Sequence, residues 1–424
     1  MTVIDLGERR DTPAPADPGS RRFLRRWAPA LVALLCLVAP TAAAPWPTQP
    51  TGTTIPANLD AHLLPVADLL LVADQTGPGA DPAPRLVAHR LPSGRPLWRV
   101  PVPGPGTPFR AVRHGDLLVL GLVGEQTEEQ QVVGLSAADG GVRWRMDGLL
   151  RGLTPAGNLL VWRLAETGPP ILLSIDAASG AVRWSRQLSV ETVRESRRDA
   201  RVSLLAVLDG GRLELRDPDT GAVVRAAALP VAATPPEVLA LTDDLVVLSD
   251  GPGGVAAYEV ATLRRRWTLS RGPADRVDVS DCGAALCLDD GSPGPRLLDP
   301  ATGSTRWRAD GWTLLESVGN WLLALSDVTG PIDELALLDA LTGRPVRHLG
   351  RWQPLSGARW GDGSIVRRRQ RDGRVLFGRL DDRGEGVRVL AALRGAVGEC
   401  DMHGVFLVCR RDGGAGVWEL PDAR

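Results

Sequence analysis

Cysteine and histidine are the residues of this 424-residue chain with the widest scope for covalent or metal chemistry, and their spacing limits it. One of the five cysteines, Cys36, lies in an apolar run, which leaves Cys282, Cys287, Cys400 and Cys409 with three possible pairings. Neither close pair has C-x-x-C spacing, and no histidine pair completes a zinc site. The spacing therefore favours two local disulfides in an oxidising compartment, and it predicts no bound metal.

Other candidate catalytic residues are weak. The chain has no lysine, so all 49 basic residues are arginine, and Schiff-base chemistry is excluded. The acid pairs Asp217/Asp219 and Asp289/Asp290 resemble turn caps more than calcium loops, since they lack a complete ligand set. The histidines are too widely spaced to form an evident site and are expected to have ordinary strand or loop roles: His62, His89, His114, His348 and His403. We predict no catalytic, cofactor-binding or metal-binding residue.

Charge argues against a nucleic-acid partner. The formal net charge is −1, and the arginine runs at 264–266 and 367–374 are interpreted as solvated strand faces. Hydrophobic residues make up 44% of the chain, enough for a packed core, while 48 glycines and 35 prolines indicate many turns.

The N-terminus carries a compartment signal. Residues 1–26 form a Pro-rich tail that ends in the basic cluster "RRFLRR", and residues 27–44 form an apolar run. Because no further arginine occurs before Arg85, the positive-inside rule predicts a cytoplasmic N-terminus and a single-pass anchor in the cell membrane. A cleaved signal peptide is the alternative, because "TAAA" resembles a cleavage site. Residues 45–60 are expected to be a linker, and 61–424 an extracytoplasmic domain.

One short unit organises that domain. A turn of the form Asp-x-x-Thr-Gly is followed by Trp or Arg four residues after the glycine, as in "DPATGSTRW". The turn position recurs every 40 to 46 residues, a period close to that of propeller blades. The unit supplies Gly94 and Trp98, Gly140 and Trp144, Gly180 and Trp184, Gly221 with Arg225, Leu263 with Trp267, Gly303 and Trp307, Gly343 with Arg347, and Gly384 with Arg388.

A second marker subdivides each unit. Asp-Gly pairs, which suit two-residue hairpin turns, precede several of the main turns by about a quarter of a repeat. Apolar runs such as "LLAVLD" lead into these pairs. Each unit is therefore predicted to be a four-stranded antiparallel sheet, with the tryptophan on the outer strand packing against the neighbouring blade and its indole N–H bonded nearby. The tryptophans at 312, 321, 352 and 360 are likewise expected to be buried rather than to form an interface.

The recurring Asp-x-x-Thr-Gly-x-x-x-Trp unit resembles the repeat of the pyrroloquinoline-quinone (PQQ)-like β-propeller family over about residues 61–424. The resemblance implies an all-β propeller, and the family contains both quinone-dependent dehydrogenases and noncatalytic propellers. Its enzymes use calcium-binding acids and amides, an Asp base and often an adjacent-cysteine disulfide, whereas this chain has no Cys-Cys pair and three asparagines. We therefore expect a noncatalytic scaffold that binds other proteins. A PQQ-dependent dehydrogenase, or a small-ligand sensor using the central channel, is the alternative.

Blade number and disulfide pairing follow from the repeat. Eight turn units are visible, and the tail after residue 397 adds three strands, so we expect eight blades, with seven or nine open. Residues 45–60 are one possible source of a missing outer strand. Cys287 and Cys409 each lie four residues before the glycine of an Asp-Gly pair, which predicts that each bonds across a short hairpin, as Cys282–Cys287 and Cys400–Cys409.

Overall fold

The computed structural model describes residues 50–420, except 75–83, 125–129, 165–168, 189–192, 199–200, 231–235, 250–253, 271–276, 292–293, 327–333, 361–362, 382, 384–385 and 397. The chain divides into two compact units, residues 1–48 and 49–424, and every feature described below belongs to the second. The predicted anchor at 27–44 and the turn glycine Gly384 lie outside the described residues. Within those residues, no helix has the length and apolar character needed to cross a bilayer.

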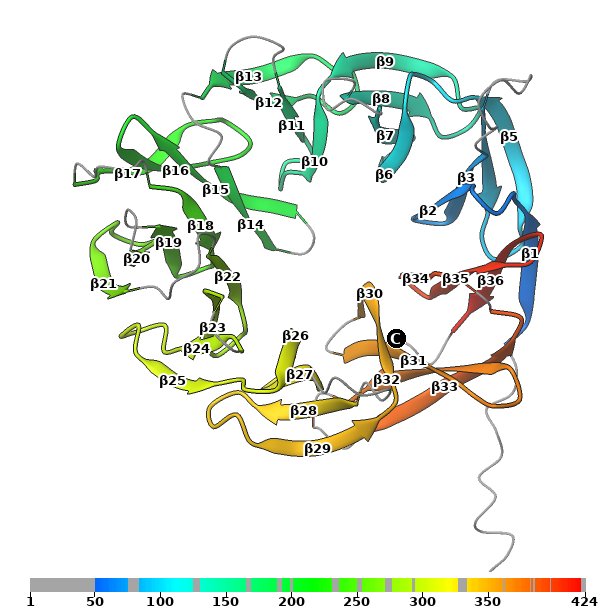
Figure 1. Ribbon diagram of the computed structural model, residues 1–424. Helices are drawn as coiled ribbons and strands as arrows, with labels where there is room; N and C mark the ends of the chain where they lie inside the picture. Colours follow the sequence, from blue (N-terminus) through cyan, green and yellow to red (C-terminus); the bar gives the residue numbers. More distant parts are fainter. Residues whose placement is uncertain are drawn as a thin grey trace, which may run out of the picture. The chain divides into compact units, whose positions relative to one another are not determined.

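Nine four-stranded antiparallel sheets, the blades of a propeller, follow one another around a central opening (Figure 1). In each sheet the first strand is innermost. From the first blade to the ninth, the innermost strands are β2 (His62–Val66), β6 (Thr107–His114), β10 (Leu149–Leu153), β14 (Val193–Arg198), β18 (Val238–Leu241), β22 (Asp278–Asp281), β26 (Trp312–Val318), β30 (Gln353–Trp360) and β34 (Cys400–His403).

The middle of each blade is formed by two apolar strands. The second strands are β3 (Leu69–Asp74), β7 (Leu117–Val123), β11 (Leu159–Arg163), β15 (Arg201–Asp209), β19 (Leu245–Ser249), β23 (Leu286–Asp289), β27 (Trp321–Ser326), β31 (Gly363–Arg369) and β35 (Phe406–Arg411). The third strands are β4 (Arg85–Arg90), β8 (Gln130–Ser136), β12 (Ile171–Ile175), β16 (Arg212–Arg216), β20 (Gly254–Glu259), β24 (Arg296–Leu298), β28 (Leu335–Asp339), β32 (Arg374–Leu380) and β36 (Gly414–Glu419). Because neighbouring blades cover both faces, most of these strands carry apolar runs, although β16, with the sequence RLELR, alternates between polar and apolar residues.

The outer strands form the rim. They are β5 (Arg95–Pro101), β9 (Val142–Asp147), β13 (Val182–Gln187), β17 (Val223–Ala228), β21 (Arg265–Ser270), β25 (Thr305–Arg308), β29 (Pro345–Gly350), β33 (Val387–Arg394) and β1 (Gly52–Pro56). The last of these comes from the start of the described chain and pairs with β36, so the two ends of the propeller meet in one sheet.

The structure corrects the predicted blade number from eight to nine. Each of the eight turn units forms its own blade, and the three C-terminal strands become a full ninth blade because β1 supplies their outer strand. Residues 52–56, expected in a linker, therefore belong to the propeller. One apolar cluster joins this ninth blade to the first, with Ile55, Leu70 and Val417 almost fully buried, and closes the ring.

The repeated tryptophans connect successive blades as predicted. Each indole N–H donates to a backbone carbonyl three residues before the turn glycine of the next blade. The acceptors are Ala137 O for Trp98 (2.9 Å), Ala177 O for Trp144 (3.1 Å), Pro218 O for Trp184 (3.1 Å), Pro300 O for Trp267 (3.0 Å) and Ala340 O for Trp307 (3.1 Å). We call this contact between a tryptophan and the next turn the Trp–Gly joint.

The glycine of this joint is required for space as well as for its backbone conformation. At Gly221, φ is +68° and an added Cβ would lie 2.6 Å from a carbon of the Trp184 indole. The blade that has Leu263 in place of this glycine retains a left-handed backbone, with φ of 53°. The preceding blade has the exposed Arg225 instead of tryptophan, and Leu263 is itself buried in the apolar cluster between the two blades. The missing tryptophan and the missing glycine thus occur at the same joint.

Aspartates cap the main turns, as their position in the repeat predicts. Asp176 Oδ1 accepts hydrogen bonds from the backbone N–H groups of Ala178 (3.1 Å) and Ser179 (2.9 Å). Hydrogen bonds from the side chains of Arg183 and Ser179 lower the pKa of Asp176 to about 2. Such turns hold the third and outer strands together at the rim.

Both predicted disulfides are present. Cys400 on β34 lies directly opposite Cys409 on β35, in register, and the two are bonded. Cys287 on β23 is bonded to Cys282, which lies one residue beyond the end of β22 rather than on that strand. The Cys400–Cys409 bond therefore crosses a strand pair, whereas the Cys282–Cys287 bond spans the connection between two strands.

Candidate functional site

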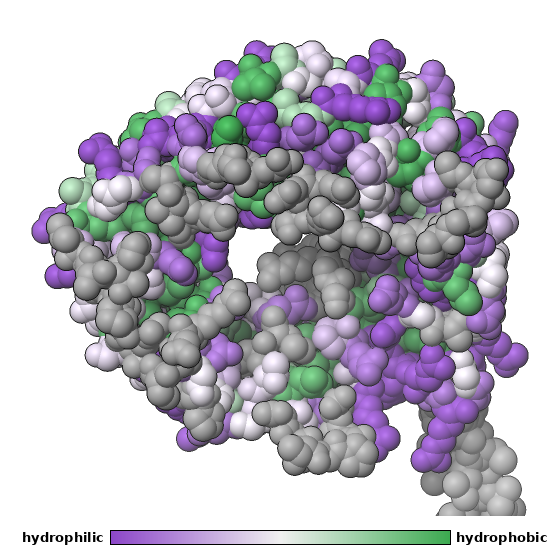
Figure 2. Space-filling view, turned by 45° about the horizontal axis from the view of Figure 1, so that its top comes forward, coloured by the Kyte–Doolittle hydropathy of each residue, from purple (hydrophilic) through white to green (hydrophobic). Residues whose placement is uncertain are grey.

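The innermost strands have an uneven charge. We call β6, β10 and β14 the basic wall: they carry six arginines, Arg110, Arg113, Arg151, Arg194, Arg197 and Arg198, and one acid, Glu195. We call β22, β26 and β34 the acidic wall: they carry Asp278, Asp281, Glu316 and Asp401 and no arginine. The two walls occupy different arcs of the ring in Figure 1, and Figure 2 shows that the ring is open at its centre.

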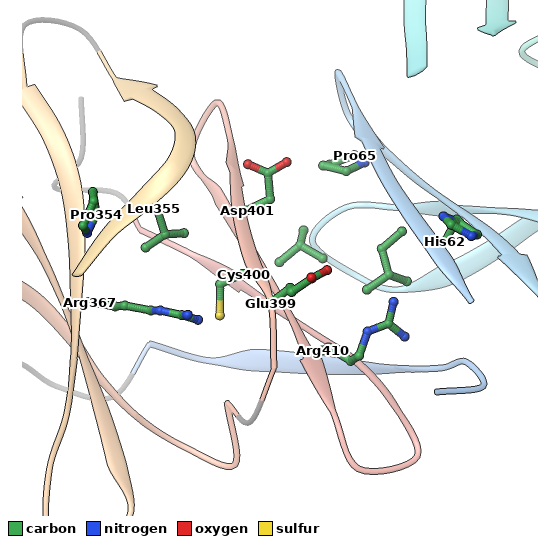
Figure 3. Close-up of a pocket in the computed structure, with 11 residues that line it drawn as sticks. His62, Pro65, Pro354, Leu355, Arg367, Glu399, Cys400, Asp401 and Arg410 are labelled. Atoms are coloured by element: carbon green, nitrogen blue, oxygen red, sulfur yellow. The ribbon is translucent and has the colours of Figure 1, made fainter. Parts of the chain in front are cut away.

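A pocket of about 410 Å³ lies where the eighth, ninth and first blades meet (Figure 3). Residues from β2, β30, β31, β34 and β35 contribute to it, so the ring closure creates it. Its lining residues are His62, Leu63, Pro65, Pro354, Leu355, Arg367, Glu399, Cys400, Asp401, Val408 and Arg410. The pocket combines apolar walls with five titratable or charged side chains, which suits a small polar ligand.

Both arginines of this pocket are bonded to backbone carbonyl groups. Arg410 donates to the carbonyl oxygens of Asn58 (3.3 Å), Leu59 and Ala61, and so ties the connection between β1 and β2 to the ninth blade. Arg367 donates to Gly398 O (3.0 Å), across from the eighth blade to the ninth. These bonds leave the guanidinium charges in place and fix their positions.

Asp401 and His403, two titratable residues of β34, have pKa values that are shifted in opposite directions. Desolvation by the surrounding strands raises the pKa of Asp401, although the residue is exposed. Burial lowers the pKa of His403, whose Nε2 accepts a hydrogen bond of 2.6 Å from the backbone N–H of Ala67 in the first blade. Only a neutral imidazole can accept that bond, so the lowered pKa and the contact are consistent.

The remaining sequence candidates have structural contacts. Asp217 Oδ1 caps its own turn by accepting from Asp219 N (3.0 Å), as the turn-cap interpretation predicts. His89 Nδ1 lies 3.0 Å from Gly94 O, and His348 Nδ1 lies 3.4 Å from Glu334. Among the described residues, no three His, Cys, Asp or Glu side chains gather as a metal site would require.

The pocket residues were missed by the sequence analysis, apart from Cys400 and the two histidines, His62 and His403, that line it or neighbour it. Arg367 was assigned to a solvated run, and Glu399 and Arg410 gave no signal. They come together only because strands from opposite ends of the chain meet at the closure.

Comparison with known proteins identifies the repeat. Residues 84–309 match a family described as outer membrane protein assembly factor BamB, which covers just over half of the chain. No curated protein matches this sequence.

Solved structures with a similar arrangement are distant. BamB from Moraxella catarrhalis is 14% identical, with 88% of this chain and 98% of that chain covered and a TM-score of 0.43. A eukaryotic initiation factor is 13% identical (81% and 89% covered, TM-score 0.49). A quinohemoprotein alcohol dehydrogenase from Comamonas testosteroni is 10% identical (87% and 75% covered, TM-score 0.43).

Proposed function

Because this chain belongs to the family described as outer membrane protein assembly factor BamB, whose repeats form PQQ-like propellers, we propose that it is a noncatalytic scaffold that binds other proteins. In this proposal residues 27–44 anchor the chain in the cell membrane, the N-terminus is cytoplasmic, and the propeller lies outside the cytoplasm.

The observation that carries the proposal is a row of exposed apolar side chains on adjacent outer strands. Val142, Val182 and Val223 each lie two residues after the turn glycine of the second, third and fourth blades, and are 44%, 51% and 44% exposed. Figure 2 shows hydrophobic residues scattered among hydrophilic ones on the outside of the ring. The three positions are equivalent on neighbouring blades, and we call them the valine row. Apolar groups within a polar surround are typical of protein interfaces.

Photo-crosslinking tests the valine row. A photoreactive amino acid at Val182 in the full-length membrane-bound protein should give a discrete adduct with a partner protein. Val346 is the matched control, because it is also an exposed outer-strand valine (46%) but has no equivalent exposed apolar residue on the sixth blade. Adducts that are absent at Val182, or identical at both positions, would contradict this interface.

The noncatalytic part of the proposal has its own test. The full-length protein, supplied with PQQ and calcium, should not reduce an artificial electron acceptor with alcohols or sugars. Turnover that a point change in the channel abolishes would make the chain a quinoprotein instead.

A small-ligand sensor is the second candidate function, and the pocket at the ring closure favours it. Its volume of about 410 Å³ and its mixture of apolar and charged walls suit a metabolite-sized molecule. Thermal-shift screening of the protein with small polar compounds tests this function. A compound that raises the unfolding midpoint of the protein but not of the Asp401→Asn variant would support a sensor. If no compound raises the midpoint, the sensor proposal fails and the scaffold proposal remains.

Mass measurement tests the anchor. Protein purified from its native membrane should still contain the peptide 1–26. A mature N-terminus near residue 45 would show that the apolar segment is a cleaved signal peptide.

A further inference from the structure

Three arginines from three successive blades converge at one point of the basic wall. Arg110 of β6 and Arg197 of β14 both donate to the backbone oxygen of Arg151 on β10, at 2.7 Å for Arg197. Two guanidinium groups therefore share one carbonyl acceptor, and the Arg151 side chain lies beside them. We call Arg110, Arg151 and Arg197 the arginine cluster.

A β-bulge makes this convergence possible. The pairing of β10 with β11 shifts between Leu150 and Gly152, so Arg151 is the extra residue, and its carbonyl group is directed at the neighbouring guanidinium groups. Gly152 also leaves room for the contact, because an added Cβ would lie 3.0 Å from Arg197 Nη1. The Arg151 guanidinium is further held over the Trp162 ring, 5.8 Å from its centroid.

Counted over the described residues, the cluster holds more positive charge than its contacts neutralise. One carboxylate, that of Glu195, is paired with Arg151 (3.3 Å) and with Arg197. Elsewhere on the same wall each arginine of an ion pair has its own acid: Arg113 pairs with Asp68, and Arg198 with Asp243 (3.2 Å). Burial, followed by repulsion from Arg197, lowers the pKa of Arg110. Packing like charges together is unfavourable unless an anion compensates them.

We propose that the arginine cluster binds a small divalent oxyanion, of the phosphate or dicarboxylate class, from the central channel. The paired N–H groups of a guanidinium match the paired oxygens of such anions. Three guanidinium groups around one point have more N–H donors than the Arg151 carbonyl oxygen and the Glu195 carboxylate can accept. About a third of the Arg151 side chain (33%) and of the Arg197 side chain (35%) is exposed, so an anion can reach both. Glu195 lies between them and competes with the ligand. This inference does not depend on the protein-binding function proposed above.

Ligand-dependent thermal unfolding of the full-length protein tests the site. Inorganic phosphate in a mildly alkaline buffer, where it is a dianion, should raise the midpoint saturably, relative to chloride at equal ionic strength. Succinate in a parallel titration distinguishes the dicarboxylate class from phosphate. A midpoint that rises with neither anion, or only linearly with salt, would overturn the proposal.

Two substitutions with opposite expected effects make the test specific. Arg197→Gln should weaken anion binding by about tenfold, because it removes one charged fork. Glu195→Gln should strengthen binding, because it removes the competing carboxylate. Arg183→Gln is the matched control: it removes an arginine and breaks an ion pair, with Asp176, at the rim of the third blade, and binding should not change.

A purely structural cluster gives a different pattern. Both Arg197→Gln and Glu195→Gln would then lower the unfolding midpoint without ligand, and neither would alter the anion dependence. That pattern would also overturn the proposal. If Arg197→Gln does not fold, Arg197→Lys keeps the charge but loses the fork, and it should still bind the anion more weakly than the unsubstituted protein.

Discussion

The joints within the ring and the joint that closes it are built differently. The Trp–Gly joint between the third and fourth blades consists of the Trp184 indole against Gly221, and the repeat supplies both residues. At the closure, between the ninth and first blades, the turn glycine Gly94 instead faces Thr53 and Ile55 of β1, where an added Cβ would lie 2.5 Å from Thr53 Cγ2. The closure adds the Arg410 bonds, the His403 contact and the Cys400–Cys409 disulfide nearby.

This difference shows two ways of joining blades. Within the ring, a repeated motif joins blades that are already neighbours in the chain. The closure must hold together segments separated by about the whole length of the propeller, so bringing them together costs more chain entropy. The closure accordingly uses several kinds of bond rather than one tryptophan.

The largest expected effect is at the closure. Ile55→Asp places an unpaired carboxylate in the fully buried cluster between the ninth and first blades and should lower the free energy of unfolding by about 4 kcal/mol or more. Thr51→Asp, at an exposed residue just before β1, is the control and should have little effect. Urea unfolding measures both. Equal effects of the two changes would mean that β1 does not close the ring.

The Trp–Gly joint gives the next largest effect. Trp184→Arg and Gly221→Leu should each cost about 2–4 kcal/mol, the first by lost packing and the second by overpacking and backbone strain. Combined, they recreate the natural pair Arg225 and Leu263 of the next joint. The double variant should therefore lose about 1–2 kcal/mol less stability than the two single losses added together. Urea unfolding of the three variants measures the coupling.

A pair of residues from different joints is the control for that cycle. Trp184→Arg combined with Gly303→Leu should show additive losses, because Gly303 packs against Trp267 instead. Additivity in both double variants would show that the tryptophan and the glycine do not act together.

The disulfides rank third. Replacing Cys400 and Cys409 by alanine should cost about 2–3 kcal/mol at most, because the closed loop is short, with nine residues of separation. The Cys282–Cys287 bond closes a shorter loop, with five residues of separation, and lies away from the closure. Replacing these two cysteines by alanine should therefore cost less. Peptide mapping without reductant checks the pairing, and urea unfolding checks the order. A larger loss at the 282–287 bond would reverse the ranking.

The smallest effect is a pH dependence at the closure. Since burial lowers the folded-state pKa of His403, the unfolded chain binds the additional proton first, and stability is lost as the pH falls below the usual histidine value of 6.5. Asp401 acts in the opposite sense: its pKa is raised, so its contribution is lost as the pH rises from 3.8. Thermal unfolding of the His403→Gln variant at pH values from 3.8 upward should no longer show the loss of stability below pH 6.5. The pH dependence due to Asp401 should remain. If the pH profile of unfolding is unchanged in this variant, protonation of His403 does not affect stability through the Ala67 contact.

The repeat could be predicted well from sequence because its determinants are local. The turn aspartate, its glycine and the tryptophan lie within about ten residues of one another, and hydrogen bonding, backbone sterics and strand geometry define their roles. The two disulfides could be predicted for the same reason, since each closes a short hairpin. Even the exceptional joint at Arg225 and Leu263 was visible as a departure from the motif, although its compensation was not.

The sequence by itself therefore determined the blade, its turns and the way one blade packs on the next. Tertiary structure alone decided that nine blades close the ring, because closure depends on β1 pairing with β36 across the length of the chain. It also decided the pocket and the arginine cluster. Arg367 and Arg410 meet His62 only at the closure, and Arg110 and Arg197 meet only at a bulge on the strand between them. The physical reason is that a periodic motif specifies contacts between neighbours, whereas these sites depend on where the accumulated rotation of the blades brings distant strands together.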